Sequence, residues 1–407
     1  MDARDPLRHF RDRFHMPRGA DGEEVIYFTG NSLGPQAKAV RDYVEQDLKD
    51  WATLGVSAHV SAKHPWMEYH AHLSRQMATI IGAEAIETIV MNSLTVNLHM
   101  MLVSFYRPTG DRYKVVIEKG AFPSDQYAIK SQIKFHGYDP SNSLVELAPR
   151  SGEATLRTED IIETIEREGD SVALVLLGGV NYYTGQAFDM KAITAAGQKA
   201  GAVVGFDLAH AAGNIEIRMR EWGVDFAVWC SYKYLNGGPG AVGGAFINER
   251  HARAFDLPRF AGWWGHDKAT RFMMGPDFQP IPGAEGWQVS NPAVLQMSAM
   301  RASLDIFEEA GMTALIEKSR KLTGYLESLI DEIADERINI ITPRDPNQKG
   351  CQLSIRVHDK SLHERIVERG VSADWREPGV IRVAPAPLYN SFADVFRFSE
   401  ILKDCLP

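Results

Sequence analysis

Short β-branched runs alternate with longer amphipathic stretches through the middle of the chain, and this alternation limits the possible folds more than any other feature. Five runs are typical of strands, at residues 113–119, 172–179, 201–207, 226–231 and 243–248. Helical patterns at 158–168 and 190–200 lie among them. Such alternation is typical of parallel βαβ units, and nearly continuous apolar strands indicate a sheet that is covered on both faces. The pattern predicts an α/β fold with a mainly parallel sheet.

The pattern changes near residue 292, where two long amphipathic segments, 293–311 and 315–333, precede short strands and one further helix. A chain of 407 residues exceeds the size at which one hydrophobic core usually keeps growing, so two domains are expected. We predict an N-terminal segment at 1–50 that docks on both domains, a large domain at 51–291 and a smaller α+β domain at 292–407. In the N-terminal segment, Asp5 and Pro6 suit a helix start, and Leu7, Phe10 and Phe14 fall on one helical face. This spacing predicts a docking helix.

Composition excludes several classes of protein. The formal net charge is −9, from 44 basic and 53 acidic residues, and no stripe of Lys and Arg stands out, so neither nucleic acid nor an anionic membrane is an expected partner. No apolar run approaches the roughly 20 residues that cross a bilayer, and the first 17 residues lack the apolar core of a secretory signal. The three cysteines show no CxxC spacing, so we expect no disulfide framework, no metal site and a cytoplasmic location.

Polar residues follow four of the predicted strands. Asp207 ends one strand and is followed by His210, and the motif AFPSD at 121–125 follows another. The motif VNYYTG at 180–185 and the pair Tyr232 and Lys233 follow two more. In open parallel sheets, ligands bind beyond the carboxyl ends of the strands. The four strand ends therefore predict one crevice.

Lys233 stands in CSYKYLNGGPGAVGG, residues 230–244, at the end of a buried strand. Burial disfavours the charged form of lysine, and a neutral amine is a nucleophile for an aldehyde, which suits a lysine that forms a Schiff base. The glycine run matches neither GxGxxG nor a phosphate loop ending in GK[ST], so a nucleotide site is a weaker interpretation. Glycines that leave room around the lysine explain the run better.

Pyridoxal phosphate needs further partners besides an amine. Asp207 could keep its ring nitrogen protonated, Phe122 could stack on the ring, and Asp125 or Ser124 could bond the ring substituents. The stretch MNSLTVN at 91–97 precedes a predicted helix whose N-terminus suits a phosphate. The residues thus indicate a pyridoxal phosphate site, although each has a common structural role when taken alone.

Several segments resemble the kynureninase family of fold-type I pyridoxal phosphate enzymes, which is related to the class V aminotransferases. The most specific are NSLTVNLH, AFPSDQYAI, FDLAHAAGN, CSYKYLNGGPG, GWWGH and VSNP, and the resemblance extends from YFTGNSLG (27–34) to IRVAPAPLYNSF (381–392). It implies a large domain with a mainly parallel seven-stranded sheet, a small α+β C-terminal domain and a homodimer with shared active sites. The implied reaction is hydrolysis of L-kynurenine, or 3-hydroxy-L-kynurenine, to L-alanine and an anthranilate, within tryptophan catabolism or NAD biosynthesis.

The resemblance also implies roles for individual residues. Lys233 would bind the cofactor covalently and then remove the α-proton of the substrate, Asp207 would pair with the ring nitrogen, and Tyr232 would donate a proton. The implied cofactor-binding residues are Leu94, Thr95, Phe122, Asp125, Thr184, Asp207, His210, Tyr232, Lys233, Trp263 and Asn291. Of these, Trp263 and Asn291 would act across the dimer interface.

For the substrate, the resemblance assigns the α-carboxylate to Arg382, whose guanidinium suits bidentate recognition. His59, Ser290 and Asn291 would meet the aromatic end, and their polar groups could accept a ring hydroxyl. Without the resemblance, His59 is read as a loop histidine.

Three other functions share parts of this pattern. A cysteine desulfurase needs a cysteine on a mobile loop, whereas Cys351 lies in the alternating stretch 350–357 and looks like a packing residue. A class V aminotransferase is disfavoured by the residues assigned to the aromatic end. A pyridoxal phosphate-dependent transcription regulator should carry a basic DNA-binding module, for which the short N-terminus leaves no space.

Overall fold

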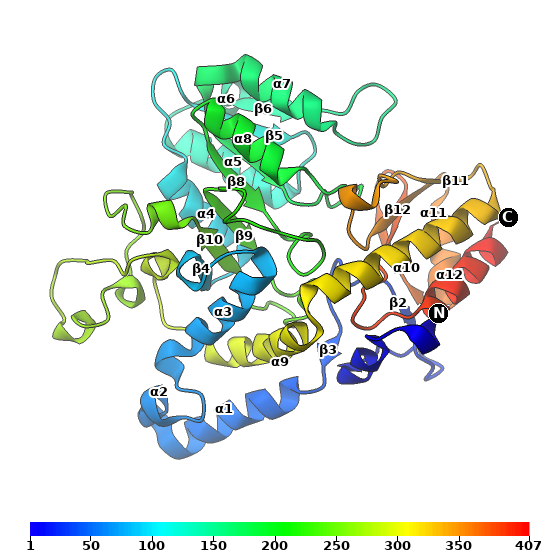
Figure 1. The fold of residues 1–407 in the computed structure, drawn as a ribbon, viewed down its shortest axis with the longest axis horizontal. Coiled ribbons are helices and arrows are strands. Elements are labelled where there is room, and N and C mark those ends of the chain that lie inside the picture. The colour runs from blue at the N-terminus through cyan, green and yellow to red at the C-terminus, as the bar shows by residue number, and fades with distance from the viewer. Residues whose placement is uncertain (407) are drawn as a thin grey trace.

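The computed structural model describes residues 1–406 and has two layered parts, a large α/β part and a smaller sheet with helices (Figure 1). The central sheet has seven strands in the order β4-β10-β9-β8-β7-β5-β6. These strands are β4 (Thr88–Val90), β5 (Lys114–Glu118), β6 (Leu144–Leu147), β7 (Val172–Gly178), β8 (Val203–Asp207), β9 (Phe226–Trp229) and β10 (Gly244–Ile247). Neighbours from β6 to β9 pair in parallel, which confirms the predicted α/β class.

Strand β10 departs from the parallel pattern that the sequence suggested. It pairs antiparallel with both β9 and β4. A parallel neighbour requires a crossover, usually through a helix, but the chain between Trp229 and Gly244 forms turns and loops. The segment that carries Lys233 therefore returns directly to the same sheet.

Helices cover both faces of the central sheet, as its apolar strands predicted. Side chains of β7 alternate between two cores, with Val175 and Leu177 in one and Leu174 and Leu176 in the other. The first core includes residues of α3 (Tyr69–Ile81), α7 (Thr158–Glu168), α8 (Met190–Lys199) and α9 (Val294–Ala310). The second includes residues of α4 (Leu94–Phe105) and α5 (Pro123–Phe135). Shorter helices α2 (Ala58–Ser61) and α6 (Pro140–Ser143) lie in the connections.

The smaller part is built on an antiparallel sheet of four strands in the order β11-β12-β15-β14. These are β11 (Ile338–Ile340), β12 (Leu353–Val357), β15 (Val380–Val383) and β14 (Asp374–Arg376), with helices α10 (Met312–Ile333), α11 (Lys360–Glu368) and α12 (Phe392–Cys405). Strand β13 (Val371–Ser372) pairs with β2 (Ile26–Tyr27), so the N-terminal segment joins this part. Both chain ends lie beside it (Figure 1).

The predicted N-terminal docking helix is wrong in its secondary structure. Two short 3₁₀ helices, Asp2–Arg4 and Arg8–Arg13, precede strand β1 (Phe14–His15), which pairs with β3 (Gln36–Ala37). Because the backbone of Phe14 lies opposite Ala37 in that pairing, a helix cannot continue through it. The spacing did select the buried side chains, since Leu7, Phe10 and Phe14 all lie in the first core.

The domain boundaries at residues 50 and 291 stay a prediction, on which two packing observations bear. Helix α1 (Val40–Leu54) runs through residue 50 without interruption. Helix α9 buries Met300 and Leu304 in the core of the central sheet, whereas Leu322 in α10 belongs to the small-domain core. This packing favours a boundary within α10. Among residues 1–406, no helix combines the length and the apolar character that a bilayer span requires.

Candidate active site

A cavity with an empty volume of about 570 Å³ lies at the carboxyl ends of the parallel strands. Its walls come from the N-terminus of α4 and from the segments that follow β5, β7, β8 and β9. The lining residues are Leu94, Thr95, Glu118, Phe122, Ser124, Asp125, Gly178, Val180, Asn181, Tyr182, Asp207, Ala209, His210, Tyr232 and Lys233. The structure thus brings the four predicted strand ends together in one site.

Lys233 lies between two aromatic rings in this cavity. Its Nζ is 5.9 Å from the ring centroid of Phe122 and 5.2 Å from that of Tyr232. Phe122 is 43% exposed although it is a large apolar residue, because its ring faces the cavity rather than the core. Gly34 packs closely against the backbone of Lys233, since a Cβ at position 34 would lie 2.6 Å from the Lys233 carbonyl oxygen. The N-terminal segment therefore approaches the lysine as closely as a backbone allows.

Two buried carboxyl groups line the same cavity. Asp207 ends β8, and Asp125 lies in the first turn of α5. Burial raises the pKa of Asp125 well above its ordinary range, and the neighbouring Asp207 carboxylate raises it further. Burial also raises the pKa of Asp207, while the Ala209 N–H at 2.7 Å and the Lys233 charge favour its ionised form. Since two adjacent carboxyls cannot both ionise easily, Asp125 keeps a proton and Asp207 is the carboxylate available to a cation.

His210 and Tyr232 stay uncharged near neutral pH. Burial lowers the pKa of His210 well below its ordinary value, and the positive charges of Lys233, Arg382 and Arg376 lower it further. Burial raises the pKa of the Tyr232 hydroxyl, which therefore keeps its proton. The cavity thus presents a neutral imidazole and a phenol that can donate.

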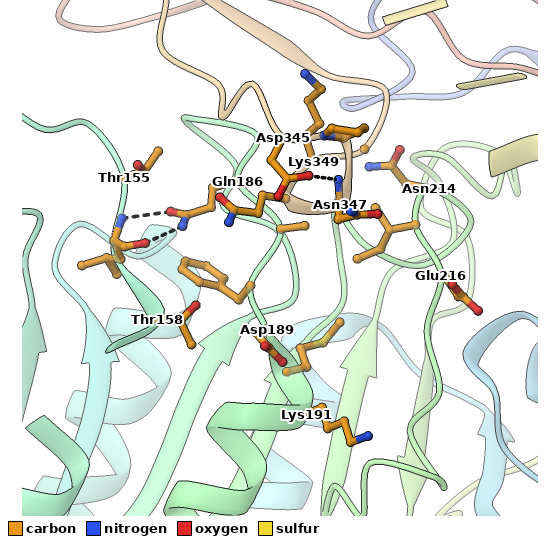
Figure 2. Close-up of a pocket in the computed structure, with 18 of the residues that line it drawn as sticks. Thr155, Thr158, Gln186, Asp189, Lys191, Asn214, Glu216, Asp345, Asn347 and Lys349 are labelled. Atoms are coloured by element: carbon orange, nitrogen blue, oxygen red, sulfur yellow. Dashed lines mark hydrogen bonds between the residues drawn. The ribbon is translucent and has the colours of Figure 1, made fainter. Parts of the chain in front are cut away.

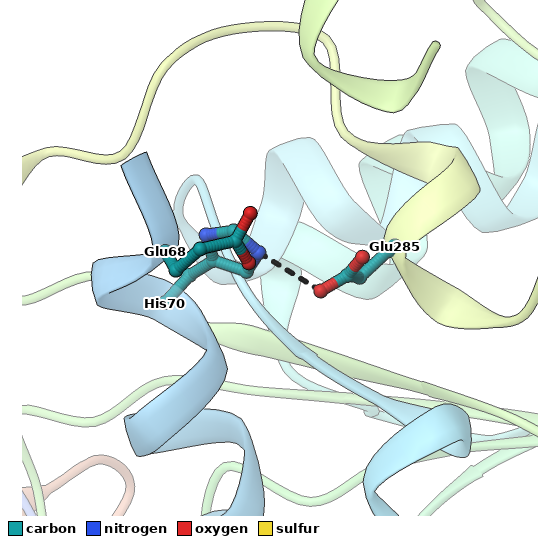
Figure 3. Close-up of side chains that lie close together, drawn as sticks. All are labelled: Glu68, His70 and Glu285. Atoms are coloured by element: carbon teal, nitrogen blue, oxygen red, sulfur yellow. Dashed lines mark hydrogen bonds and ion pairs between the residues drawn. The ribbon is translucent and has the colours of Figure 1, made fainter. Parts of the chain in front are cut away.

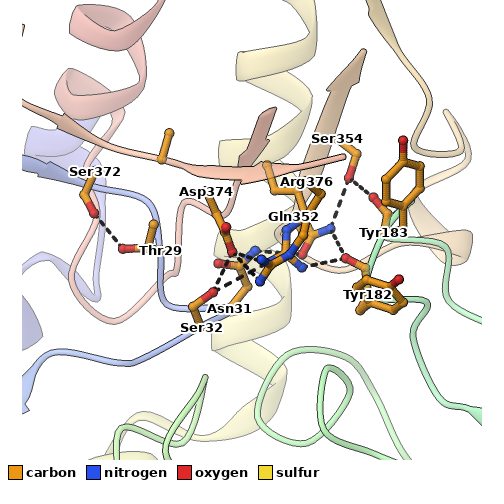
Figure 4. Close-up of polar contacts among 12 residues, drawn as sticks. Thr29, Asn31, Ser32, Tyr182, Tyr183, Gln352, Ser354, Ser372, Asp374 and Arg376 are labelled. Atoms are coloured by element: carbon orange, nitrogen blue, oxygen red, sulfur yellow. Dashed lines mark hydrogen bonds and ion pairs between the residues drawn. The ribbon is translucent and has the colours of Figure 1, made fainter. Parts of the chain in front are cut away.

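Arg382 lies next to the cavity but does not line it. Its side chain is 1% exposed, its Nη1 donates to the Tyr182 carbonyl at 2.7 Å, and its Nη2 pairs with Asp374. Burial lowers the pKa of Arg382, and the Asp374 carboxylate opposes this shift. The surrounding polar contacts join the N-terminal segment, the large domain and the small domain (Figure 4). A buried ion pair therefore holds the arginine that the family resemblance assigned to the substrate.

Besides Arg382, five predicted site residues lie outside the cavity lining in a single chain. Thr184 is buried, and its hydroxyl donates to the Asn181 side chain at 3.1 Å. Trp263 is 44% exposed, and Ser290 and Asn291 line a separate cavity beside Asn92 and Ser93, just ahead of α4. His59 is half-buried on helix α2, where its Nδ1 contacts the Val56 carbonyl at 3.0 Å. Their assigned roles stay predictions.

Sequence reasoning did not select Glu118 and Asn181. The Glu118 carboxylate accepts from the Asn181 amide at 2.6 Å and from the Gly178 N–H at 2.8 Å. Asn181 in turn accepts from the Tyr183 and Thr184 N–H groups, which fixes the turn at the cavity wall. The available signal was the position of Glu118 at the end of a predicted strand.

A larger cavity, with an empty volume of about 1680 Å³, lies between the large and small domains and contains none of the predicted site residues (Figure 2). Its polar groups largely satisfy one another. Gln186 bonds both backbone groups of Leu156, and Asp345 accepts from the Asn347 N–H at 2.9 Å. Lys349 is paired with Glu327, which does not line this cavity. This cavity is a polar seam between domains and lacks the lysine and aromatic pair of the smaller one.

Glu68, His70 and Glu285 form a cluster whose side-chain atoms could hold a metal ion (Figure 3). Glu285 accepts from His70 Nε2 at 3.0 Å. The Lys268 ammonium already lies 2.8 Å from Glu68 and 2.9 Å from Glu285. An amino group thus serves as the cation there, so the cluster supports no metal proposal.

The fold and the cavity define a fold-type I pyridoxal phosphate enzyme, in which a lysine after one strand and an aspartate after its neighbour share one site. Solved structures agree on the fold. The Escherichia coli cysteine desulfurase CsdA superposes with a TM-score of 0.77 at 16% identity, covering 98% of each chain. The cystine C–S lyase C-DES, in complex with cysteine persulfide, gives 0.79 at 15% identity, covering 94% of this chain and 98% of its own.

Sequence relatives identify the family. The kynureninase of Koribacter versatilis (strain Ellin345) is 62% identical over 402 residues, 98% of this chain and 95% of the relative. The kynureninase of Myxococcus xanthus (strain DK1622) is 57% identical over 405 residues, 99% and 95% of the two chains. The family model of the kynureninase C-terminal domain matches residues 315–402. The chain belongs to the kynureninase family and is an enzyme of that type.

Proposed function

We propose that this enzyme hydrolyses L-kynurenine, or its 3-hydroxy derivative, to L-alanine and the matching anthranilate. The observation that carries the proposal is the cavity in which Lys233, Asp207 and Phe122 converge, in a chain that is 62% identical to a kynureninase over nearly its full length. Water supplies a hydroxyl to the carbonyl carbon, the bond between the β- and γ-carbons breaks, and hydrogen ends on the β-carbon of alanine. The free, buried cysteines are compatible with a cytoplasmic location, which we propose as well.

The cofactor is pyridoxal phosphate, and the residues in the cavity fit it. Asp125 Oδ1 and His210 Nδ1 are buried polar atoms without a partner among the described residues, and both belong to residues of the lining. Lys233 would hold the aldehyde, Asp207 the ring nitrogen and Phe122 the ring face. We assign contacts to the phosphate and ring substituents to a further set: Leu94, Thr95, Asp125, Thr184, His210 and Tyr232. Bound there, pyridoxal phosphate supplies the electron sink that stabilises negative charge on the substrate.

The side chains of this site would then bind the substrate and move its protons. Arg382 would bind the α-carboxylate, which a buried guanidinium recognises strongly. The freed Lys233 amine would take the proton from the α-carbon. Tyr232 keeps its phenolic proton because burial raises its pKa, and we assign it as the proton donor when the carbon–carbon bond breaks.

We propose a homodimer that completes each site with residues from its partner. The partner would supply Trp263 and Asn291, both of which lie outside the cofactor cavity lining of their own chain. The segment around Trp263 also exposes large apolar side chains that a partner could cover, namely Phe255, Phe260, Trp263, Phe272, Met273 and Met274. His59, Ser290 and Asn291 would contact the aromatic end of the substrate and select between the two kynurenines.

A rate assay with both substrates tests this function. The purified enzyme, loaded with pyridoxal phosphate, is supplied with L-kynurenine or 3-hydroxy-L-kynurenine, and the fluorescent aromatic product and alanine are quantified together. We expect equal amounts of the two products and no requirement for a 2-oxo acid. Amino transfer that depends on a 2-oxo acid, or sulfide release from cysteine in place of anthranilate formation, would assign the chain to the aminotransferase or desulfurase alternative.

A further inference from the structure

One carboxylate oxygen of Asp374 accepts hydrogen bonds from three donors, and Arg382 is one of them. Asp374 Oδ2 accepts from the Ser32 hydroxyl at 2.7 Å and from Arg376 Nη2 at 3.1 Å, and it pairs with Arg382. Asp374 and Arg382 are directly opposite on the antiparallel strands β14 and β15. Ser32 comes from the N-terminal segment, so the cluster links that segment to the small-domain sheet (Figure 4).

The contacts of Arg382 leave one part of its guanidinium free. Nη1 donates to the Tyr182 carbonyl, and Nη2 donates to Asp374 and lies 3.5 Å from the Ser32 hydroxyl, while Nε is buried and has no partner within residues 1–406. A guanidinium is a rigid plane with five N–H donors, so two fixed corners determine the direction of the remaining edge. The edge that carries Nε is therefore oriented but unused.

We propose that Asp374 is a positioning residue for the substrate carboxylate, which acts by holding Arg382 in the orientation that presents this free edge. The inference rests on the proposed function, in which Arg382 binds the α-carboxylate. Asp374 does not touch the substrate, and its effect passes entirely through the guanidinium.

Asp374 can orient Arg382 without preventing it from binding a second carboxylate, because its carboxylate oxygen is shared among three donors. Ser32 and Arg376 draw on the same oxygen as Arg382, so the negative charge is divided among three donors. Arg376 also compensates the charge of Asp374, which leaves Arg382 with net attraction for an incoming carboxylate. A neutral side chain at position 374 would leave two arginines facing each other without an anion between them.

The test compares two ligands that differ only in the carboxylate. L-Alanine carries the amine and the carboxylate, whereas L-alaninamide carries the amine and an uncharged amide. Binding to the holoenzyme is followed by the absorbance change of the bound cofactor. For Asp374→Asn we expect L-alanine to bind about 10-fold more weakly, because a hydrogen bond to a charged group is lost, and L-alaninamide to bind almost as in the parent enzyme.

Two further variants keep the test decisive. Ser32→Ala removes one donor to Asp374, together with an oxygen 3.5 Å from Arg382 Nη2, without changing any charge. It should weaken L-alanine binding by a smaller factor than Asp374→Asn. It also serves as the test variant if the Asp374→Asn chain fails to fold. Arg382→Gln should abolish the preference for L-alanine over L-alaninamide. If Arg382→Gln keeps that preference, the proposed role of Arg382 fails. If it loses the preference while Asp374→Asn and Ser32→Ala bind both ligands unchanged, or bind L-alanine more tightly, only the positioning role is overturned.

Discussion

Asp207 is the residue whose charge the site controls most closely. Its carboxyl is buried, the Ala209 N–H caps one oxygen, and the adjacent Asp125 takes the proton that two neighbouring acids would otherwise share. Because Asp207 stays ionised, it can stabilise a protonated ring nitrogen in the cofactor. This is the chemical role that the electron sink requires.

Asp207→Asn should therefore impair the chemical step far more than cofactor binding. The amide oxygen can still accept from Ala209, but it cannot keep a ring nitrogen protonated, so kcat should fall by about 100-fold or more. Steady-state rates and the absorbance of the bound cofactor would be measured together, with Asp207→Glu as the control that keeps the charge. Near-normal turnover in Asp207→Asn would exclude the assigned role.

The burial of Cys351 distinguishes this enzyme from a desulfurase, which needs a cysteine on a mobile loop. It is 0% exposed, and burial raises the pKa of its thiol to about 12, so it remains a protonated packing group. Cys351→Ala should keep kynurenine hydrolysis within about 2-fold of the parent rate and lower the free energy of unfolding by about 1 kcal/mol. Activity and urea denaturation check this, with the buried Cys405→Ala as the matched variant. A folded Cys351→Ala enzyme without activity would contradict the packing role.

At this scale, the sequence predicted the residues that follow strands but not their supports. Asp207, Phe122, Asp125, His210, Tyr232 and Lys233 all line the cavity because the carboxyl ends of parallel strands meet at one edge. Asp374 gave no local signal, since its partner Arg382 becomes its neighbour only through the pairing of β14 with β15. Cross-strand partners of this kind depend on register, which a single sequence does not reveal.

The turn after β7 connects the two domains through hydrogen bonds. Three consecutive carbonyls, those of Tyr182, Tyr183 and Thr184, accept hydrogen bonds from small-domain side chains. The donors include Arg382, Ser354 and Thr342. Glu118 also fixes this turn, because its carboxylate accepts from the Asn181 side chain. One buried carboxylate at the end of β5 therefore stabilises the turn whose Tyr182 carbonyl binds Arg382.

The contact between α3 and the short helix at Ala284–Trp287 should depend on pH. Burial raises the pKa of Glu285, but hydrogen bonds from His70 and Lys268 outweigh it and lower the value from 4.5 to about 2. A carboxyl with a depressed folded-state pKa stabilises the fold above 4.5 and loses that contribution as pH falls toward 2.

Glu285→Gln should accordingly destabilise the protein by about 2 kcal/mol near pH 7, after allowance for partial exposure. The difference from the parent should stay constant down to about pH 5 and shrink as the pH falls below 4.5. Urea denaturation at several pH values measures it, and the exposed Glu68→Gln variant serves as control. A difference that does not change between pH 7 and pH 3 would show that the charge of Glu285 is not its source.

Helices were predicted correctly where they follow from local amphipathic spacing, whereas segments whose conformation or direction depends on strand pairing were predicted wrongly. The helices at 158–168 and 190–200 were selected by their amphipathic spacing, and the structure has α7 and α8 there. The apolar spacing of residues 7–14 looked equally helical, yet pairing of Phe14 with Ala37 imposed an extended end. The direction of β10 likewise depended on the connection before it and not on its own residues.

At the scale of the whole molecule, the proposed homodimer predicts complementation between inactive chains. Lys233→Ala removes the cofactor-binding amine, and Trp263→Ala removes a residue assigned to the partner's site. Unfolding and refolding the two variants together should give mixed dimers in which both defects fall in one site and the other site is intact.

An equal mixture should recover about a quarter of the parent activity, because half of the dimers are mixed and each contains one working site. Product formation and sedimentation would be measured on the mixture, and each variant refolded alone supplies the background. Recovery no higher than that background, with dimers present, would place Trp263 in the site of its own chain.

Chemical trapping of the cofactor on the holoenzyme tests most directly whether Lys233 forms the Schiff base. Borohydride reduces a Schiff base between pyridoxal phosphate and a lysine to a stable secondary amine, which peptide mass spectrometry then locates. We expect a single pyridoxyl adduct on Lys233, which is lost in Lys233→Ala together with the visible absorbance of the bound cofactor. An adduct on another lysine, or an active enzyme that carries none, would contradict it.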